Sequence, residues 1–176
     1  MKNKILLFML MLAGLLFSAP GLASQEENKL LAVFFGRFAS YIELPDRAAA
    51  HFVITLVDEN PFGSLLDDLY RGKVIAGKPV AIRYATRVED IGQSDILFIT
   101  LVNPRSRQDA IDYATKNSIL TISTAMGFAE RGGIIQLDFL QQHTRIKINH
   151  AAAVKSNIRI GAALLSVATV IRGETR

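Results

Sequence analysis

The chain has 176 residues, of which 50% are hydrophobic and none is cysteine, and its formal net charge is +4. The absence of thiols excludes disulfides, thiol catalysis and redox switching, so stability must come from burial and backbone pairing. The basic residues occur singly or in pairs, without the basic stripe and interleaved aromatics of nucleic-acid-binding proteins, so we expect no nucleic-acid partner.

The first 23 residues have the pattern of a secretory signal peptide. Two lysines precede an apolar run over residues 5–17, and small residues follow at the expected cleavage positions. A run of this length is short of the roughly 20 residues that span a bilayer. We therefore expect cleavage near Ala23 and an exported mature chain, residues 24–176, that is long enough to form one domain.

Residues 26–42 predict an amphipathic helix that ends at Leu44-Pro45. Further aromatic and apolar side chains widen the apolar face of this helix. If the helix carries a partner surface, we expect it to use Phe35, Arg37 and Tyr41, because aromatic residues and arginine dominate interface energies. Burial of Phe35 and Tyr41 in the core is the alternative. Spacings of three and four place one apolar set on a single buried face: Leu30, Leu31, Phe34, Phe38 and Ile42.

Apolar runs at Phe52–Val57 and Ile96–Val102 predict strands that are buried on both faces, because neither run alternates with polar residues. Pro79–Ala85 and Ile119–Ile122 predict further strands, and Pro104–Lys116 predicts a surface helix between two strands. Strand, helix and strand in this order predict right-handed crossovers and parallel pairing.

The loop after the first predicted strand turns the chain into a short helix. Asn60 stands at the N-cap position and Pro61 at the first helical position. Asp58 and Glu59 then lie near the positive end of that helix, where carboxylates are favoured by about 0.3 to 1 kcal/mol. We expect this loop to be structural rather than catalytic.

The last third of the chain predicts a hairpin and a helix. Residues 135–139 and 145–149 alternate between apolar and polar side chains, which indicates two antiparallel strands with one solvated face and places Asp138 opposite Arg145 or Lys147. Residues 158–171 are apolar nearly all round and predict a buried helix. The predicted fold is α/β, with a mixed, mostly parallel central sheet flanked by helices on both faces and an antiparallel hairpin near the C-terminus.

No catalytic or cofactor motif is present: the sequence lacks a phosphate-binding loop, GxGxxG, GxSxG and HExxH. His51, His143 and His150 lack the spacing of metal ligands. The hydroxyl cluster Ser123-Thr124 has no base marked beside it, so a turn is the preferred interpretation. We expect a binding protein and not an enzyme, with no catalytic residues, no cofactor and no metal.

Several fragments occur together in one order and spacing. The fragments are Phe34-x3-Phe38-x2-Tyr41-Ile-Glu-Leu-Pro45, Asp58-Glu-Asn-Pro-Phe-Gly63, Asp95-Ile-Leu-Phe-Ile99, Leu120-Thr-Ile-Ser123, Gly127-Phe-Ala-Glu-Arg-Gly-Gly133, Arg145-Ile-Lys-Ile-Asn149 and the closing apolar segment. This set resembles the YfiR family (YfiR/HmsC-like periplasmic regulators, also catalogued as a domain of unknown function) over residues 29–172.

The resemblance implies a periplasmic protein that represses an inner-membrane diguanylate cyclase by binding the cyclase's periplasmic domain, which lowers cyclic di-GMP and biofilm formation. In such systems an OmpA-like outer-membrane lipoprotein can sequester the repressor, and a homodimer is a further expectation. Ser94 stands where family members often have a cysteine, so disulfide control of the kind proposed for them is absent. Leu44 replaces the usual tryptophan of Glu-Trp-Pro.

Two other functions stay open. A periplasmic small-ligand sensor would use the crevice at the carboxyl ends of the parallel strands, lined by the loops after Val57, Val102 and Ser123. An uncharacterised hydrolase is the remaining alternative, although no catalytic constellation supports it.

Overall fold

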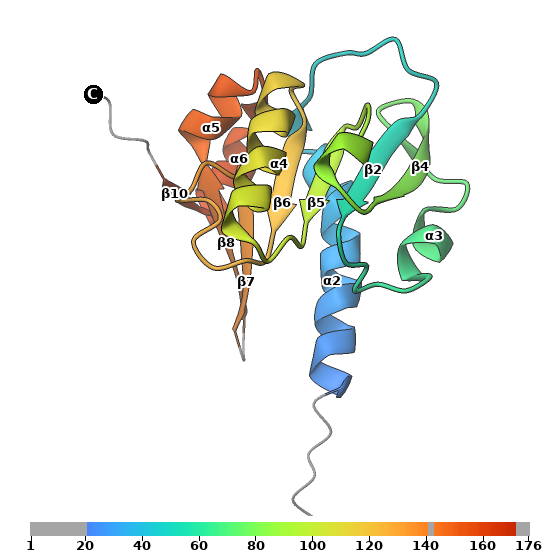
Figure 1. Cartoon of the computed structure of the whole chain (residues 1–176), viewed down its shortest axis with the longest axis horizontal. Coiled ribbons are helices and arrows are strands. Elements are labelled where there is room, and N and C mark those ends of the chain that lie inside the picture. The colour runs from blue at the N-terminus through green and yellow to red at the C-terminus, as the bar shows by residue number, and fades with distance from the viewer. Residues whose placement is uncertain (1–20, 141–142, 172–176) are drawn as a thin grey trace, which may run out of the picture.

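The computed structural model describes residues 21–140 and 143–171 (Figure 1). Most of the predicted signal peptide lies outside these residues, and its cleavage near Ala23 stays a prediction. Helix α2 (Gly21–Ala39) begins earlier than the sequence pattern predicts and ends before Ile42. Ile42 instead enters β1 (Ile42–Glu43), a short strand that pairs with β9 (Arg159–Ile160).

Within the described residues, eight strands form one sheet in the order β10-β8-β7-β6-β5-β2-β4-β3. Four helices besides α2 and one short 3-10 turn connect them. The strands are β2 (Phe52–Val57), β3 (Val74–Ile75), β4 (Lys78–Ala85), β5 (Ile96–Ile99), β6 (Leu120–Ser123), β7 (Ile135–Leu140), β8 (His143–Asn149) and β10 (Thr169–Ile171), and the helices are α3 (Leu65–Tyr70), η1 (Val88–Asp90), α4 (Pro104–Lys116), α5 (His150–Lys155) and α6 (Ala162–Val167).

The pairing confirms the mixed, mostly parallel sheet. The strands β4, β2, β5, β6 and β7 are parallel neighbours, and β10 runs parallel to β8. The β7–β8 hairpin is antiparallel, as the alternation predicts, and β3 pairs antiparallel with β4. The predicted spans of β2 and α4 match the structure, whereas β5 is shorter than predicted and ends at Ile99.

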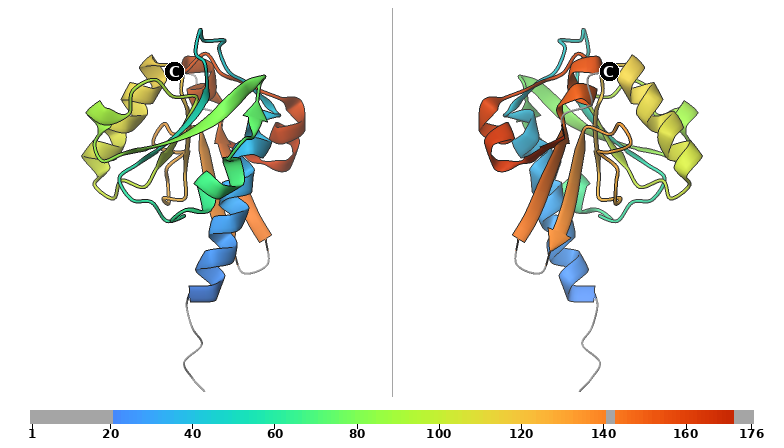
Figure 2. Two further views of the ribbon diagram at one scale, coloured as in Figure 1. Left: turned by 90° about the vertical axis from the view of Figure 1, so that its right-hand side faces the viewer. Right: turned by 90° about the vertical axis from the view of Figure 1, so that its left-hand side faces the viewer.

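The sheet separates two apolar clusters, and helices cover both of its faces. Alternate residues of β5 serve both clusters: Ile96 and Phe98 pack with α2, whereas Leu97 and Ile99 pack with α4. Successive side chains of a strand point to opposite faces of the sheet. Because both faces are buried here, every position of such a strand is apolar. Figure 2 shows α4 on one side of the sheet and α2, α5 and α6 on the other, so the predicted layer arrangement is confirmed.

The polar face of the β7–β8 hairpin is less solvated than the sequence predicts. Asp138 is the register partner of Arg145, as expected, but its carboxylate lies 3.8 Å from Nζ of Lys147. Gln136 is fully buried and accepts a hydrogen bond from the N–H of Ala129. The loop before β7 covers this face, which the alternation alone does not reveal.

The prediction of one buried helix over residues 158–171 is wrong. The segment forms β9, the six-residue helix α6 and the edge strand β10. Gly161 ends any continuous helix because its N–H donates to the carbonyl of Tyr41 at 2.8 Å, and an added Cβ there would lie 2.8 Å from the same oxygen. β-Branched residues on both sides of α6 favour strands, and Val167 is exposed.

The predicted helix start at Pro61 is also wrong, because α3 begins at Leu65. Asn60 closes a turn instead: its Oδ1 accepts from the N–H of Phe62 at 3.0 Å and its Nδ2 donates to the carbonyl of Gly63 at 2.9 Å. Asparagine side chains often mimic a backbone turn in this way. The turn sends Phe62 into the core, where it packs beneath α2.

Candidate partner-binding face on α2

Helix α2 is anchored by a buried stripe that is rotated from the predicted one. Leu31, Ala32, Phe35 and Phe38 are the buried residues, whereas Leu30 is 41% exposed. The ring of Phe35 lies 5.5 Å from that of Phe98 and 5.8 Å from that of Phe62, centroid to centroid. Phe35, one of the three candidate partner-binding residues, is therefore a core residue and presents no surface.

The other two candidates lie on the opposite, exposed side of the helix. Arg37 is exposed, and Tyr41, just beyond the helix end, is 46% exposed. Spacings of three, four and four place them in line with Leu30 and Val33. We call these four residues, Leu30, Val33, Arg37 and Tyr41, the α2 outer face. It presents two aliphatic side chains, one phenol ring and one guanidinium together.

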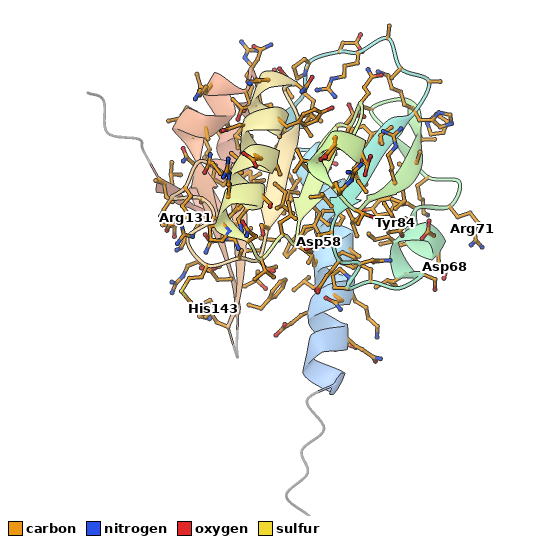
Figure 3. The ribbon with its side chains drawn as sticks, viewed as in Figure 1. Asp58, Asp68, Arg71, Tyr84, Arg131 and His143 are labelled. Carbon is orange, nitrogen blue, oxygen red and sulfur yellow. The ribbon has the colours of Figure 1, made fainter. Side chains whose placement is uncertain are left out.

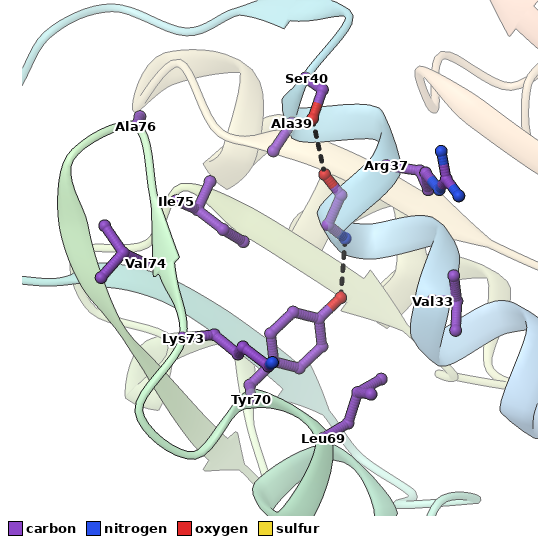
Figure 4. Close-up of a pocket in the computed structure, with 11 residues that line it drawn as sticks. Val33, Arg37, Ala39, Ser40, Leu69, Tyr70, Lys73, Val74, Ile75 and Ala76 are labelled. Carbon is purple, nitrogen blue, oxygen red and sulfur yellow. Dashed lines mark hydrogen bonds between the residues drawn. The ribbon is translucent and has the colours of Figure 1, made fainter.

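A groove of about 560 Å³ runs along this face, between α2 and the segment that joins α3 to the β3–β4 turn (Figure 4). Its cations are Arg37 and Lys73, and none of the lining residues is acidic. Among the described residues neither cation makes an ion pair. The lining residues are Val33, Gly36, Arg37, Ala39, Ser40, Leu69, Tyr70, Lys73, Val74, Ile75 and Ala76.

The wall of the groove is held by one tyrosine. The hydroxyl of Tyr70 accepts the N–H of Gly36 at 2.7 Å and donates to the carbonyl of Ala32 at 2.7 Å. Burial raises the pKa of Tyr70 above its ordinary value, and the hydrogen bond from Gly36 lowers the pKa by less. The hydroxyl therefore stays protonated near neutral pH and serves as donor and acceptor at once.

Tyr41 lies where the groove meets a second hollow. That hollow, of about 550 Å³, is lined by Tyr41, β1, β9 and α5, and Ser40 borders both spaces. Val154 of α5, which lines this hollow, is strongly exposed. The α2 outer face is therefore continuous with further apolar surface toward the C-terminal part of the chain.

A separate crevice lies at the carboxyl ends of β2, β5 and β6, where the sequence places a possible ligand site. The three expected loops meet there: Glu59, Val102 and Thr124 line one space of about 370 Å³, together with Leu31 of α2 and Phe139 of β7. Figures 1 and 2 show the first turns of α2 and the β7–β8 hairpin extending in the same direction on either side of this end of the sheet.

Two hydroxyls of this crevice, those of Ser123 and Thr100, form hydrogen bonds with the backbone. Ser123 donates to the carbonyl of Ile99 at 2.6 Å and accepts from the N–H of Ala125, and Thr100 donates to the carbonyl of Val57 at 2.8 Å. An oxygen committed in this way is not an activated nucleophile. Ser123 therefore shapes the turn between β6 and the next loop.

Charged side chains elsewhere are spread over the surface (Figure 3). Asp68 and Arg71, for example, pair with each other at 2.9 Å on the exposed side of α3. No cluster of three or more potential metal ligands occurs among the residues that the structure describes. In the same residues, no helix is long and apolar enough to cross a membrane.

The groove itself was not predicted from the sequence. Tyr70 and Lys73 reach α2 from a segment that is more than thirty residues away along the chain, as the Gly36–Tyr70 bond shows. The sequence signal for it is Tyr70 at the end of the short helix α3. A buried tyrosine usually needs a hydrogen-bond partner.

A family model described as YfiR/HmsC-like matches residues 28–169. The chain belongs to the YfiR/HmsC-like family. The match includes α2 from Asn28 onward, the whole groove and every crevice residue except Glu27, so both candidate sites of this YfiR/HmsC-like chain lie almost entirely within the matched region. A search of curated proteins found no match.

Two solved structures share the fold. A conserved domain protein from Vibrio cholerae O1 biovar El Tor has a TM-score of 0.57 and 16% identity, and an ABC domain from Streptococcus pneumoniae, in complex with L-Trp, has a TM-score of 0.53 and 11% identity. Each alignment covers 82% of this chain and 60% of the other one. This YfiR/HmsC-like chain therefore spans less than two thirds of the length of these structures.

Proposed function

We propose that the protein is a periplasmic regulator that binds the periplasmic domain of an inner-membrane diguanylate cyclase through the α2 outer face and represses it. The observation that supports this most is the unpaired, partly apolar face itself, on a chain of the YfiR/HmsC-like family. Repression lowers cyclic di-GMP and biofilm formation. An OmpA-like outer-membrane lipoprotein is proposed as a second partner that sequesters the regulator, and a homodimer as its assembled form.

The side chains along the groove indicate which kind of partner segment would bind there. Val33 and Val74 supply apolar surface, and Arg37 and Lys73 supply two cations without a carboxylate among the groove residues. A complementary segment carries apolar side chains flanked by Asp or Glu, because opposite charges raise association rates and exclude wrong partners. Aromatic and arginine residues such as Tyr41 and Arg37 are the expected energetic centre.

Repression requires the regulator to prefer one conformation of the cyclase. A preference of about 3 kcal/mol shifts the balance between active and inactive cyclase by roughly a hundredfold. Binding both conformations equally would change nothing, however tight the complex.

The test is capture of the purified periplasmic domain of the candidate cyclase by immobilised protein. Arg37→Glu is expected to weaken capture at least tenfold, since it replaces an attractive charge by a repulsive one. Arg105→Glu makes the same charge change on α4, on the other side of the sheet, and is expected to leave capture intact. Equal capture by both variants and the parent protein would remove the α2 outer face from the proposal.

A ligand-binding sensor is the second candidate, favoured by the crevice between α2 and β7. The charged residues of its lining are Glu27, Glu59 and Arg107, beside the apolar side chains of Phe98 and Phe139, which fits an apolar ligand that carries both an amino group and a carboxylate. The Streptococcus pneumoniae domain of similar fold is in complex with L-Trp, so tryptophan and related amines are the first probes.

Thermal denaturation tests this second candidate. A ligand at 100 times its dissociation constant adds about 2.7 kcal/mol to the free energy of unfolding. The shift is expected in the parent protein and is expected to shrink in Phe139→Ala, which removes an aromatic wall. Unchanged melting temperatures with every probe would indicate that the crevice is only a packing gap.

A further inference from the structure

The hydroxyl of Tyr70 bonds to both groups of one donor–acceptor pair in α2, the N–H of Gly36 and the carbonyl of Ala32. In a regular α-helix the N–H of residue 36 donates directly to the carbonyl of residue 32. Here the hydroxyl accepts from Gly36 and donates to Ala32, each at 2.7 Å. A side-chain hydroxyl inserted between donor and acceptor is one of the recognised causes of helix bending.

The insertion depends on the glycine at position 36. An added Cβ would lie 3.1 Å from the hydroxyl oxygen of Tyr70 and 3.4 Å from its Cε1. A glycine inside a helix is otherwise unfavourable relative to alanine. The glycine and the tyrosine hydroxyl therefore fit each other, and Figure 4 shows Tyr70 at the wall of the groove with its hydroxyl directed at α2.

We infer that the hydroxyl of Tyr70 is inserted between the N–H of Gly36 and the carbonyl of Ala32 and that Tyr70 is thereby a positioning residue: it sets the course of α2 at Gly36 and so fixes how Val33 and Arg37 are presented along the groove. The functional meaning of this inference rests on the proposed partner face. The inserted position of the hydroxyl does not depend on that proposal, and the first two experiments test it without any partner.

The first test compares Gly36→Ala in two backgrounds by thermal denaturation. In the parent protein the new methyl group crowds the hydroxyl, and the melting temperature is expected to fall. In the Tyr70→Phe background the hydroxyl is gone and the helix preference for alanine remains, so Gly36→Ala is expected to raise the melting temperature by about 2 °C. The same sign of change in both backgrounds would overturn the inference.

The second test measures the direction of α2. Tyr70→Phe lets the N–H of Gly36 bond directly to the carbonyl of Ala32, so residual dipolar couplings of residues 25–35 are expected to report a changed orientation relative to β2. Tyr84→Phe is the matched control, because it also removes a tyrosine hydroxyl, which in this case bonds from β4 to Asp67 of α3 rather than to α2. It is expected to leave α2 unchanged, and an unchanged α2 in Tyr70→Phe would contradict the inference.

Capture of the cyclase domain separates this inference from the proposed function. Tyr70→Phe is expected to weaken capture severalfold, and Tyr84→Phe is not. If α2 changes direction in Tyr70→Phe while capture is unaffected, the outer face is not the binding surface and the inserted hydroxyl has no role in binding.

Discussion

Gly133 lies directly against the ring of Phe128: an added Cβ on Gly133 would be 2.1 Å from Cε1 of that ring. Both residues are buried, and the N–H of Gly133 also donates to the carbonyl of Phe128 at 3.0 Å. The tight loop before β7 is therefore closed by a glycine because no side chain fits between the backbone and the phenyl ring.

Gly133→Ala is expected to destabilise the protein by about 1–3 kcal/mol, because overpacking forces the ring or the backbone to move. Urea denaturation measures the change. The double variant Gly133→Ala/Phe128→Leu is expected to lose less than the two single losses combined, since the smaller side chain removes the collision. Additive losses would show that the two positions are not coupled.

Arg47 is expected to be the most important cation for stability. Its guanidinium donates to the carbonyls of Ser94, Asn117 and Ser118 and lies 3.9 Å from the carboxylate of Asp95. Replacement by alanine leaves these groups unpaired in a largely buried place, which costs about 2–3 kcal/mol.

The control for Arg47 is Arg87→Ala. Arg87 is largely exposed and pairs only with Glu89 and Asp90 in the same short turn, and such surface pairs contribute about 0–1 kcal/mol. Chemical denaturation of both variants, at the same salt concentration, gives the comparison. A loss for Arg47→Ala no larger than that for Arg87→Ala would contradict the assignment.

Two helix caps are expected to differ in strength. Asn103 caps α4 by accepting N–H groups of Arg105 and Ser106, and it is exposed, so Asn103→Ala is expected to cost about 1 kcal/mol. Asn149 caps α5 and, being buried, also donates to the carbonyl of Ala129 at 2.7 Å.

Asn149→Ala is therefore expected to cost about 2–3 kcal/mol, since it removes a cap and leaves a buried carbonyl unsatisfied. Thermal denaturation of both variants shows which substitution causes the larger loss of stability. A larger loss at Asn103 would mean that solvent replaces the Asn149 bonds.

The stability provided by Tyr70 is expected to depend on pH. Its pKa in the folded protein is raised by burial, so the unfolded chain ionises first, at about pH 10. The contribution is fully present below pH 10 and is lost as the pH rises through the folded-state pKa. Urea denaturation between pH 8 and 11 is expected to show the difference between the parent protein and Tyr70→Phe shrinking above pH 10; a constant difference would disprove the role of ionisation.

The sequence predicts those elements whose pattern is local. The apolar run of β2 and the segment Pro104–Lys116 of α4 mark both elements correctly, because burial on two faces and a proline at the start of a helix leave a direct trace in the sequence. The segment 158–171 is mispredicted because an all-apolar segment does not distinguish a helix from short strands. Gly161 is the missed signal.

The site is only half predictable for a similar reason. Periodicity identifies α2 as amphipathic, but the wide apolar stripe leaves its rotation undetermined, and only the packing of Phe35 on Phe62 and Phe98 decides it. Arg37 and Tyr41 remain on the exposed side. The groove depends on a contact between α2 and Tyr70 that no local pattern contains.

The pairing of β1 with β9 also has a consequence for biosynthesis. Ile42 finds its strand partner only at Ile160, so the C-terminal end of α2 stays without this ladder until nearly the whole polypeptide has left the ribosome. A nascent or truncated chain that stops before β9 cannot fix that end of the helix. The fold thereby delays the last backbone contacts at the C-terminal end of α2 until synthesis of the described part of the chain is almost finished.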